Sequence, residues 1–213
     1  AGVEGGERGG GERSGHSLTK TEITQAKAAL RRQVEDRLRQ MELEARVMAG
    51  RRLCEAMRRH AFWRDARQLL CFAPMPGEID IWPLVLSALC EGKCVALPRY
   101  DRAAKFYTVH VIRSESDVAP GFWGIREPAA DCPSPKSDLL DLIIVPGVAF
   151  NESGWRLGRG KGYYDRLLKA WRGRTCGVCY DEQMVEHIPV EPHDIQLDCI
   201  LTPTRYFQPR GSE

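Results

Sequence analysis

No stretch of about 18 consecutive apolar residues occurs in this 213-residue sequence, so no segment is expected to cross a lipid bilayer. A large net charge is also absent, because 31 Lys and Arg residues stand against 29 Asp and Glu residues. This near balance argues against a protein whose main task is to bind nucleic-acid phosphates. The opening residues AGVEGGERGGGERSG lack the basic stretch and apolar core of a secretory signal. We therefore expect a cytoplasmic protein with no membrane and no nucleic-acid partner.

A disulfide framework is not indicated, although the chain holds eight cysteines. Most of them lie inside apolar segments, where reduced buried thiols are common. Cys176 and Cys179 form a lone CxxC pair, with no second Cys or His pair nearby to complete a zinc site. The segment TCGVCY is also compatible with a short buried strand. The cysteines therefore predict a reducing compartment.

The chain does contain enough apolar side chains for a folded core, since 43% of its residues are apolar. A chain of this length can bury roughly 70% of its unfolded surface. Basic residues are concentrated early: residues 18–67 carry 13 basic and 7 acidic side chains, whereas residues 68–213 carry 16 and 19. The cationic region either attracts a partner with several negative charges or is a solvated, Arg-rich helix surface. Composition leaves both interpretations open.

The amino-terminal part divides into a tail and two helices. Residues 1–17 hold seven glycines and no apolar cluster, so we expect a flexible tail, followed by a single domain over residues 18–213. From Thr24 to Met41 apolar residues recur at helical spacing. A second helix is expected at residues 42–59. Its apolar side is expected to hold Leu43, Val47, Cys54 and Met57.

Beyond residue 67 the pattern changes to short apolar strands separated by helices. The run DLIIVPGVAF is the strongest strand signal and is typical of a sheet buried on both faces. Other strands are expected at RQLLCFAPM, KCVALPRY, FYTVHVI, TCGVCY and DCILTPTR, and helices at IWPLVLSALCEG and YYDRLLKAW. This alternation predicts an α/β fold with a doubly wound, mostly parallel sheet flanked by helices as a three-layer sandwich. Ligands of such sheets bind at the carboxyl ends of the strands, which here means the loops after Phe72, Pro98 and Phe150.

A glycine-rich basic loop follows the strongest strand and leads into a helix. The loop NESGWRLGRGKG has four glycines, which permit close backbone approach to a ligand, and three cations between them. Exposed amides, cations and the positive end of a helix dipole together form a phosphate-binding site. The spacing is neither that of a Walker A loop nor GxGxxG. A flexible basic hairpin tip is the alternative interpretation.

Two acidic residues are candidates for binding a magnesium ion. Asp165 comes three residues after the last of these glycines, in the first turn of the expected helix. An acid there complements the helix dipole, but Mg²⁺ beside a triphosphate also takes one or two carboxylates. Asp194, in the segment VEPHDIQLD, is the candidate for the second carboxylate.

These segments resemble the 5-formyltetrahydrofolate cyclo-ligase family, also called methenyltetrahydrofolate synthetases. The block PGVAFNESGWRLGRGKGYYDRLL carries the most specific part of the resemblance. The segments AKAALRR, GEID, LPRY, GFWGIREP, VEPHDIQLD and TPTR occur in the family's order, so the resemblance covers the chain from about Lys27 to Arg205.

The resemblance implies an enzyme that uses ATP and Mg²⁺ to close 5-formyltetrahydrofolate, with or without a polyglutamate tail, to 5,10-methenyltetrahydrofolate with release of ADP and phosphate. A formyl group on nitrogen is an amide, and its resonance makes the carbonyl carbon a poor electrophile. Phosphorylation of the formyl oxygen would remove that protection and create a leaving group. The neighbouring N10 would then attack within the same molecule. We expect the protein to be a monomer.

The resemblance assigns ATP contacts to particular residues. Lys27 and Arg31 would reach the phosphates from one face of the first helix, since they lie four residues apart. The rest of the triphosphate site would be formed by Arg156, Leu157, Gly158, Arg159, Gly160, Lys161, Gly162, Tyr163 and Tyr164. Arg159 and Lys161 would face the transferring phosphoryl group and, with Tyr163, form the implied catalytic set. Asp165 and Asp194 would hold Mg²⁺.

Folate contacts are implied in the same way. Glu78 would accept hydrogen bonds from two adjacent N–H donors of the pterin ring. Trp123 would stack on the folate, although a core aromatic is the alternative. Ala73 would line the pterin slot and Tyr163 would close over it. The implied substrate contacts also include Arg159, Gly160, Lys161 and Gly162.

The sequence departs from the family pattern at two notable positions. Asn151 stands where the family usually has Asp, and Trp82 replaces a small polar residue and is expected to narrow or reshape the pterin slot. Two other functions are kept as alternatives. A non-catalytic relative that binds folate or nucleotide would be favoured by loss of the glycine block or Asp165, and both are present. An RNA-binding module would need aromatic residues among the basic ones, and residues 24–59 contain none.

Overall fold

The computed structural model describes residues 19–121 and 124–209. The expected tail at residues 1–17 and the expected stacking residue Trp123 lie outside these ranges. A seven-stranded sheet forms the centre in the order β11-β10-β9-β6-β1-β2-β3. Its strands are β1 (Gln68–Leu70), β2 (Cys94–Asp101), β3 (Phe106–Ile112), β6 (Leu139–Val145), β9 (Arg172–Val178), β10 (Cys199–Leu201) and β11 (Tyr206–Phe207).

The sheet is mostly parallel, as the sequence predicted. The strands from β10 to β2 pair in parallel, and the two edge strands, β3 and β11, pair antiparallel with their neighbours. Two small antiparallel pairs lie outside it: β4 (Val118–Pro120) with β5 (Arg126–Pro128), and β7 (Ala149–Phe150) with β8 (Arg156–Leu157).

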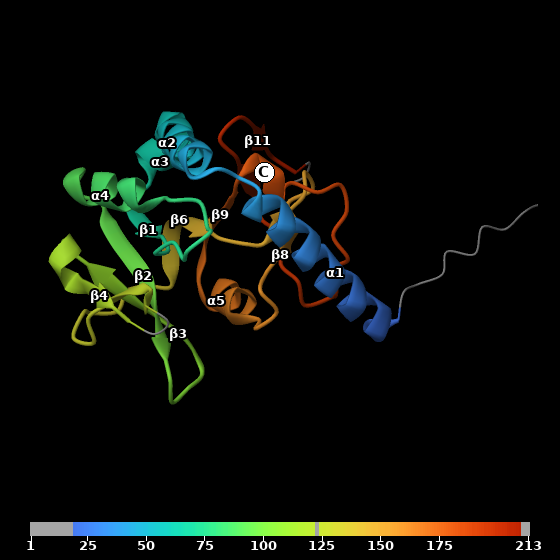
Figure 1. Cartoon of the computed structure of the whole chain (residues 1–213). Coiled ribbons are helices and arrows are strands. Elements are labelled where there is room, and N and C mark those ends of the chain that lie inside the picture. Colours follow the sequence, from blue (N-terminus) through green and yellow to red (C-terminus); the bar gives the residue numbers. More distant parts are fainter. Residues whose placement is uncertain (1–18, 122–123, 210–213) are drawn as a thin grey trace, which may run out of the picture.

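Helices cover both faces of the sheet and complete the three layers (Figure 1). The helices are α1 (Lys20–Arg39), α2 (Leu43–Arg59), α3 (Ala61–Asp65), α4 (Trp82–Cys90) and α5 (Tyr163–Ala170). Short 3₁₀ helices span Glu115–Asp117 and Asp181–Gln183. Residues of α2, α3 and α4 form one core cluster with the sheet, and α5 forms a second cluster on the opposite face. No helix in the described ranges is long and apolar enough to cross a membrane.

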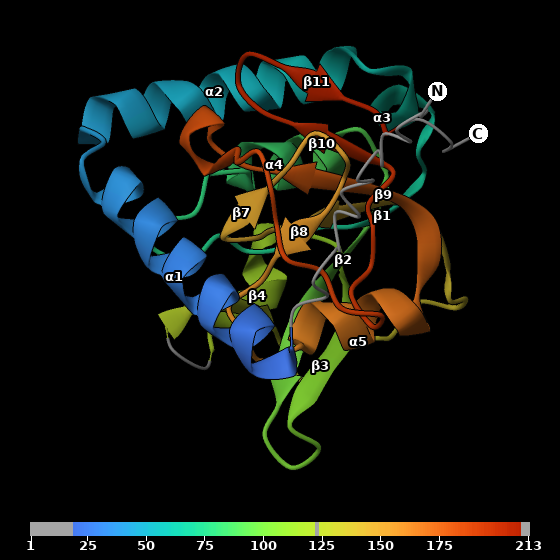
Figure 2. The same cartoon turned by 90° about the vertical axis from the view of Figure 1, so that its right-hand side faces the viewer.

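Helix α1 begins at a capping box, in which the Thr19 and Glu22 side chains bind each other's backbone amides. Its buried residue Val34 packs with Ala149 and Leu157 of the β7–β8 hairpin, and Figure 2 shows the helix running past this hairpin. The first helix of the chain is thereby placed beside the loop that leads into α5.

Two sequence expectations differ from the structure. The run DLIIVPGVAF is not one strand: β6 ends at Val145, and the chain enters β7 only at Ala149. Pro146 has no N–H to donate and so cannot continue the strand ladder. The apolar side assigned to the second helix is also partly wrong. Cys54 and Met57 are buried, whereas Leu43 is 76% exposed, since it lies in the first turn of α2 beyond the edge of the core.

Candidate active site

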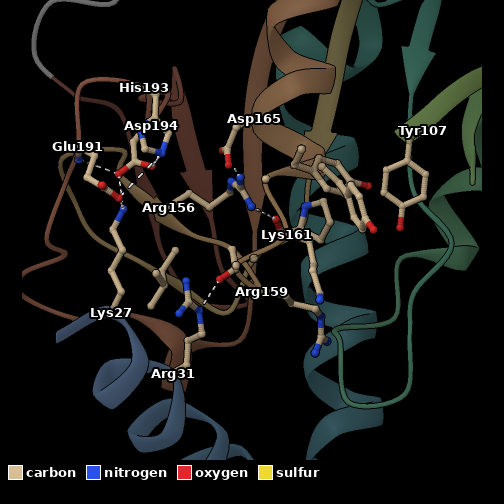
Figure 3. A pocket seen from close by; sticks show the side chains of 18 of the residues that line it. Lys27, Arg31, Tyr107, Arg156, Arg159, Lys161, Asp165, Glu191, His193 and Asp194 are labelled. Carbon is tan, nitrogen blue, oxygen red and sulfur yellow. Dashed lines mark hydrogen bonds and ion pairs between the residues drawn. The ribbon is translucent and has the colours of Figure 1, made fainter. Parts of the chain in front are cut away.

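A cavity of about 720 Å³ opens between α1, the loop after β6, the β8–α5 loop and residues 191–194 (Figure 3). Met75 and Glu78, which follow β1, and Pro146 and Gly147, which follow β6, line one side of it. The cavity therefore lies at the carboxyl ends of two central parallel strands, where the doubly wound fold predicted a site. Its volume is in the range of small-molecule sites.

The glycine-rich loop forms the floor of this cavity with the geometry that its composition predicted. Gly160 and Gly162 have φ angles of +86° and +65°, which residues with a Cβ rarely adopt. Gly162 is also the N-cap of α5, so the amino-terminal end of that helix faces the cavity. Gly158 leaves room for Arg156, because a Cβ there would lie 2.8 Å from its Nη1. The loop thus presents backbone and cations to a ligand.

Lys27 is buried at the edge of the cavity and pairs with two carboxylates. Its Nζ lies 2.6 Å from Asp194 Oδ2 and 2.9 Å from Glu191 Oε2. Burial alone would lower the pKa of Lys27, but the hydrogen bonds and charges of Asp194 and Glu191 outweigh it and raise that pKa above 10.5. The hydrogen bond from Lys27 lowers the pKa of Glu191. These contacts join α1 to a segment more than 160 residues later in the chain.

Arg31 lies one turn further along α1 and contacts the glycine-rich loop. Its Nε donates a hydrogen bond of 2.8 Å to the carbonyl oxygen of Gly158. Burial lowers the pKa of the Arg31 guanidinium from its ordinary value. Lys27 and Arg31 therefore share one helix face, as their spacing predicted, and both line the cavity.

Arg156 forms a second ion pair on the opposite side of the loop. Its Nη2 donates to Asp165 Oδ1 at 2.6 Å, and its guanidinium carbon lies 5.7 Å from the ring centroid of Tyr164. The Asp165 carboxylate, in the first turn of α5, therefore has a cationic partner within the protein. Burial raises the pKa of Tyr164 well above 10, so its hydroxyl stays protonated beside this pair.

Asp194 lies in a group of side chains that a metal ion could bind. The ligand atoms of Glu191, His193 and Asp194 all lie within 4.8 Å of one another. Asp165 is not a member of this group, because its carboxylate contacts Arg156 instead (Figure 3). Glu191 and His193 were not predicted from the sequence. The sequence could have indicated them, because both lie within three residues of Asp194 in the segment VEPHD.

Glu78 and Arg159 join the loop to the other end of the cavity. Arg159 Nη2 lies 3.2 Å from Glu78 Oε1, while Glu78 Oε2 accepts the amide of Met75 at 3.0 Å. Ala73 does not line the main cavity. It lines a narrow adjoining slot that shares Glu78 and Tyr164 with the cavity.

Three tyrosines pack together near Glu78, and two of them, Tyr107 and Tyr163, line the cavity. Tyr163 lines the cavity, and its hydroxyl donates to that of Tyr100 at 3.3 Å. Its ring centroid lies 5.3 Å from that of Tyr107, which lines both the cavity and the slot. Tyr107 was not predicted, because the regular alternation of its strand does not distinguish a site residue from any other.

Lys161 lines the cavity and makes no ion pair within the described part of the chain. Leu157 and the glycines that follow it also lie in the cavity wall, as predicted. Trp82 does not line the slot and so does not narrow it directly, but its ring packs under Arg126, which does line it. The indole Nε1 of Trp82 donates to Glu115 at 2.9 Å, so the side chain lies in the core beside β5.

Asn151 occupies a turn position that does not require charge. Its side-chain oxygen accepts the amide of Trp155 at 3.0 Å, which holds the turn between β7 and β8. Cys176 and Cys179 are buried in and after β9, away from the residues that line the cavity.

Comparison with known proteins gives one consistent result. A model of the 5-formyltetrahydrofolate cyclo-ligase family matches residues 23–203. The chain is 29% identical to the 5-formyltetrahydrofolate cyclo-ligase of Mus musculus over 196 residues, covering 84% of this chain and 94% of the mouse protein. It is 35% identical to that of Escherichia coli K12 over 152 residues, covering 67% and 81%. The NMR structure of Aquifex aeolicus 5,10-methenyltetrahydrofolate synthetase is similar, with a TM-score of 0.77, 31% identity, and coverage of 86% of this chain and 93% of that chain.

Proposed function

The chain belongs to the 5-formyltetrahydrofolate cyclo-ligase family, and we propose that it converts 5-formyltetrahydrofolate to 5,10-methenyltetrahydrofolate with consumption of ATP. One observation carries the proposal for ATP. A glycine-rich loop precedes a helix N-terminus and itself carries the cations Arg156, Arg159 and Lys161. Two further cations, Lys27 and Arg31, line the same cavity from α1. Such an arrangement suits a polyphosphate, whose charges are stabilised by cations and backbone amides.

In this proposal the cavity holds both reactants. The triphosphate lies on the glycine-rich loop, with Lys27 and Arg31 contacting it from α1. The pterin lies toward Glu78 and the slot lined by Ala73, where the carboxylate accepts ring N–H donors. Arg159 supports this division, because it lies in the loop and already pairs with Glu78. The formyl oxygen and the terminal phosphate would meet between them.

The chemical step requires alignment and charge stabilisation rather than a strong nucleophile. Transfer of the phosphoryl group to the formyl oxygen breaks the bond to ADP and activates the formyl carbon. N10 then attacks that carbon and phosphate leaves. Arg159 and Lys161 would stabilise the charge of the transferring group, and Tyr163 would close the site against water.

Magnesium fits the carboxylates at this site. Mg²⁺ prefers one or two carboxylates together with phosphate oxygens and water, and the Asp194 side chain offers one such oxygen beside Glu191. Asp165 and Asp194 are the proposed ligands, and Asp165 would exchange Arg156 for the metal. When bound, Mg²⁺ would neutralise charge on the triphosphate. The monomeric state and the cytoplasmic location stay predictions.

A direct assay tests the proposal against a relative that binds without turnover. Protein, ATP, Mg²⁺ and 5-formyltetrahydrofolate are mixed, and formation of the methenyl product is followed by its near-ultraviolet absorbance. We expect product only when ATP is present. Binding of either ligand without product at saturating concentrations would contradict the proposed reaction and support the non-catalytic alternative.

A further inference from the structure

We propose that Glu127 is a second carboxylate that recognises N–H donors of the substrate's flat ring, in addition to Glu78. The assignment rests on the proposed function, because it requires the folate to occupy the slot beside Glu78. Glu127 lies in β5, in the segment GFWGIREP, outside the glycine-rich loop.

The first observation is a buried charge without a cationic partner. Glu127 is 6% exposed, and no Lys, Arg or His of the described chain forms an ion pair with it. Its Oε1 accepts one long hydrogen bond, from the amide of Tyr100 at 3.3 Å. The buried lysines differ, since Lys27 and Lys93 each bind several oxygen atoms. A buried carboxylate with so few partners is costly in the free protein, which is expected where a ligand supplies the missing donors.

The second observation is its position. Glu127 lines the same slot as Ala73, Glu78 and Tyr107. Burial and then the negative charges of Glu127 and Glu78 raise the pKa of Tyr107 to about 12, which places both carboxylates close to that ring. The backbone of Gly121 packs directly against the Glu127 carboxylate, because a Cβ there would clash with Oε2. Two acceptors therefore face one slot.

The chemistry of the slot selects the class of ligand. Phe72, Met75, Pro98 and Ile125 are among its apolar walls. Its charged lining residues are the two carboxylates and Arg126, whose guanidinium lies over the Trp82 ring. The slot holds only about 50 Å³, so a ring would lie in the adjoining 720 Å³ cavity and insert one edge into the slot. A planar ring that carries N–H donors on that edge, as a reduced pterin does, suits this arrangement. A ring without those donors would leave a buried carboxylate unpaired and would be rejected.

Glu127 also borders a cavity of about 700 Å³ that includes Arg99 and His110 in its lining. A role toward the substrate's tail in that cavity is the competing explanation. Only the competing role requires the substrate's tail. A pterin fragment without that tail therefore distinguishes the two roles.

The test uses Glu127→Gln, which keeps the shape and one acceptor oxygen but removes the charge. We expect KM for 5-formyltetrahydrofolate to rise roughly tenfold, as for loss of a hydrogen bond to a charged group, with KM for ATP unchanged within twofold. Glu127→Asp, which keeps the charge, should give an intermediate KM and replaces the first variant if that one does not fold. Glu44→Gln, an exposed substitution on α2, is the matched control and should change neither constant.

Two further measurements distinguish a role of Glu127 in substrate recognition from a role in the stability of the fold. Glu127→Gln removes an unpaired buried charge, so its unfolding temperature should equal or exceed that of the wild type. Its affinity for 5-formyltetrahydropterin, which lacks the tail, should fall by the same factor as for the whole substrate. An unchanged folate KM, unchanged fragment binding, or a lower unfolding temperature with both KM values raised would overturn the assignment. An inactive wild-type protein would instead contradict the proposed function.

Discussion

Lys27 and Lys93 are both buried lysines, but the regions around them differ in chemistry. Lys93 donates to the backbone carbonyls of Trp63, Arg64 and Ala66 at 2.7–3.2 Å, at the end of α3. These acceptors are neutral, whereas the carboxylate that pairs with Lys93, that of Glu91, is more distant at 3.6 Å, and all of them lie away from the cavity. The Lys93 ammonium therefore supplies hydrogen-bond donors to the last carbonyls of α3, which have no partners within the helix.

The short contacts of Lys27 are instead to two carboxylates, at 2.6 and 2.9 Å. Glu191 and Asp194 could bind a metal ion or phosphate-bound cation, and they line the cavity together with Lys27. The comparison teaches that burial of a charge does not by itself indicate function. The chemistry and accessibility of the partner atoms distinguish a structural lysine from one that belongs to a site.

The largest expected effect on activity concerns Lys161. This lysine lines the cavity but is exposed, unlike the two buried lysines compared above. Lys161→Ala should lower kcat by roughly 10²–10³-fold, because in the proposed function it removes a cation that stabilises the transferring phosphoryl group. Folate binding should survive. Single-turnover assays and equilibrium binding measure the two quantities. Lys169→Ala, on the exposed side of α5, is the control, and unchanged turnover in Lys161→Ala would refute the role given to Lys161.

The next effect tests the two buried lysines directly. Lys27→Met should raise KM for ATP by about tenfold or more, because the charge-assisted contact to phosphate that we propose for Lys27 would be lost. Lys93→Met should leave KM unchanged and destabilise the protein by roughly 1–3 kcal/mol through its unpaired carbonyls. Steady-state kinetics and thermal unfolding are measured on both variants. A raised KM in Lys93→Met at a temperature where it is folded would break the distinction.

A smaller effect is expected for Asp165. Asp165→Asn removes the charge from a proposed metal ligand and also weakens the pair with Arg156, so the Mg²⁺ concentration needed for half-maximal activity should rise several-fold. A titration of activity with Mg²⁺ at saturating ATP measures this shift. An unaltered titration would remove Asp165 from the proposed metal site.

The smallest effect is a pH dependence of stability. The folded-state pKa of Glu191 is lowered from 4.5, so its contribution is present above that pH and is lost as the pH falls through the lowered value. The pKa of Lys27 is raised from 10.5, so its contribution persists until the pH exceeds 10.5. Thermal unfolding of Glu191→Gln should depend less on pH between 5 and 3 than that of the wild type. Parallel profiles would contradict this assignment.

The sequence predicted those helices, strands and loops whose pattern is contained in a short stretch of neighbouring residues. The helical spacing after Thr24, the basic glycine-rich loop and the apolar strand run each correspond to an element of the fold. The break at Pro146 was missed because an uninterrupted apolar run does not reveal that a proline ends the hydrogen-bond ladder. Leu43 was misplaced because helical periodicity gives a face but not the limits of the core that covers it.

Side-chain partners were harder to predict than elements. Periodicity placed Lys27 and Arg31 on one face, but nothing in their neighbourhood indicated that Lys27 contacts Asp194. Such a contact depends on how distant segments fold together. The pairing of Asp165 with Arg156 was missed for a different reason: nine residues separate them, and the direction of each side chain is set by the hairpin and helix that carry them. Glu127 gave no sequence signal, because burial of its carboxylate becomes visible only in three dimensions.

The ion pairs of α1 also constrain the order in which the protein matures. Lys27 leaves the ribosome early, whereas its partners Glu191 and Asp194 are translated 164 and 167 residues later. A nascent chain therefore carries the first helix without its docking partners during most of translation. A truncated product that ends before residue 191 would lack these ion pairs, so the nucleotide site of the proposed function would be complete only in chains that are almost fully synthesised.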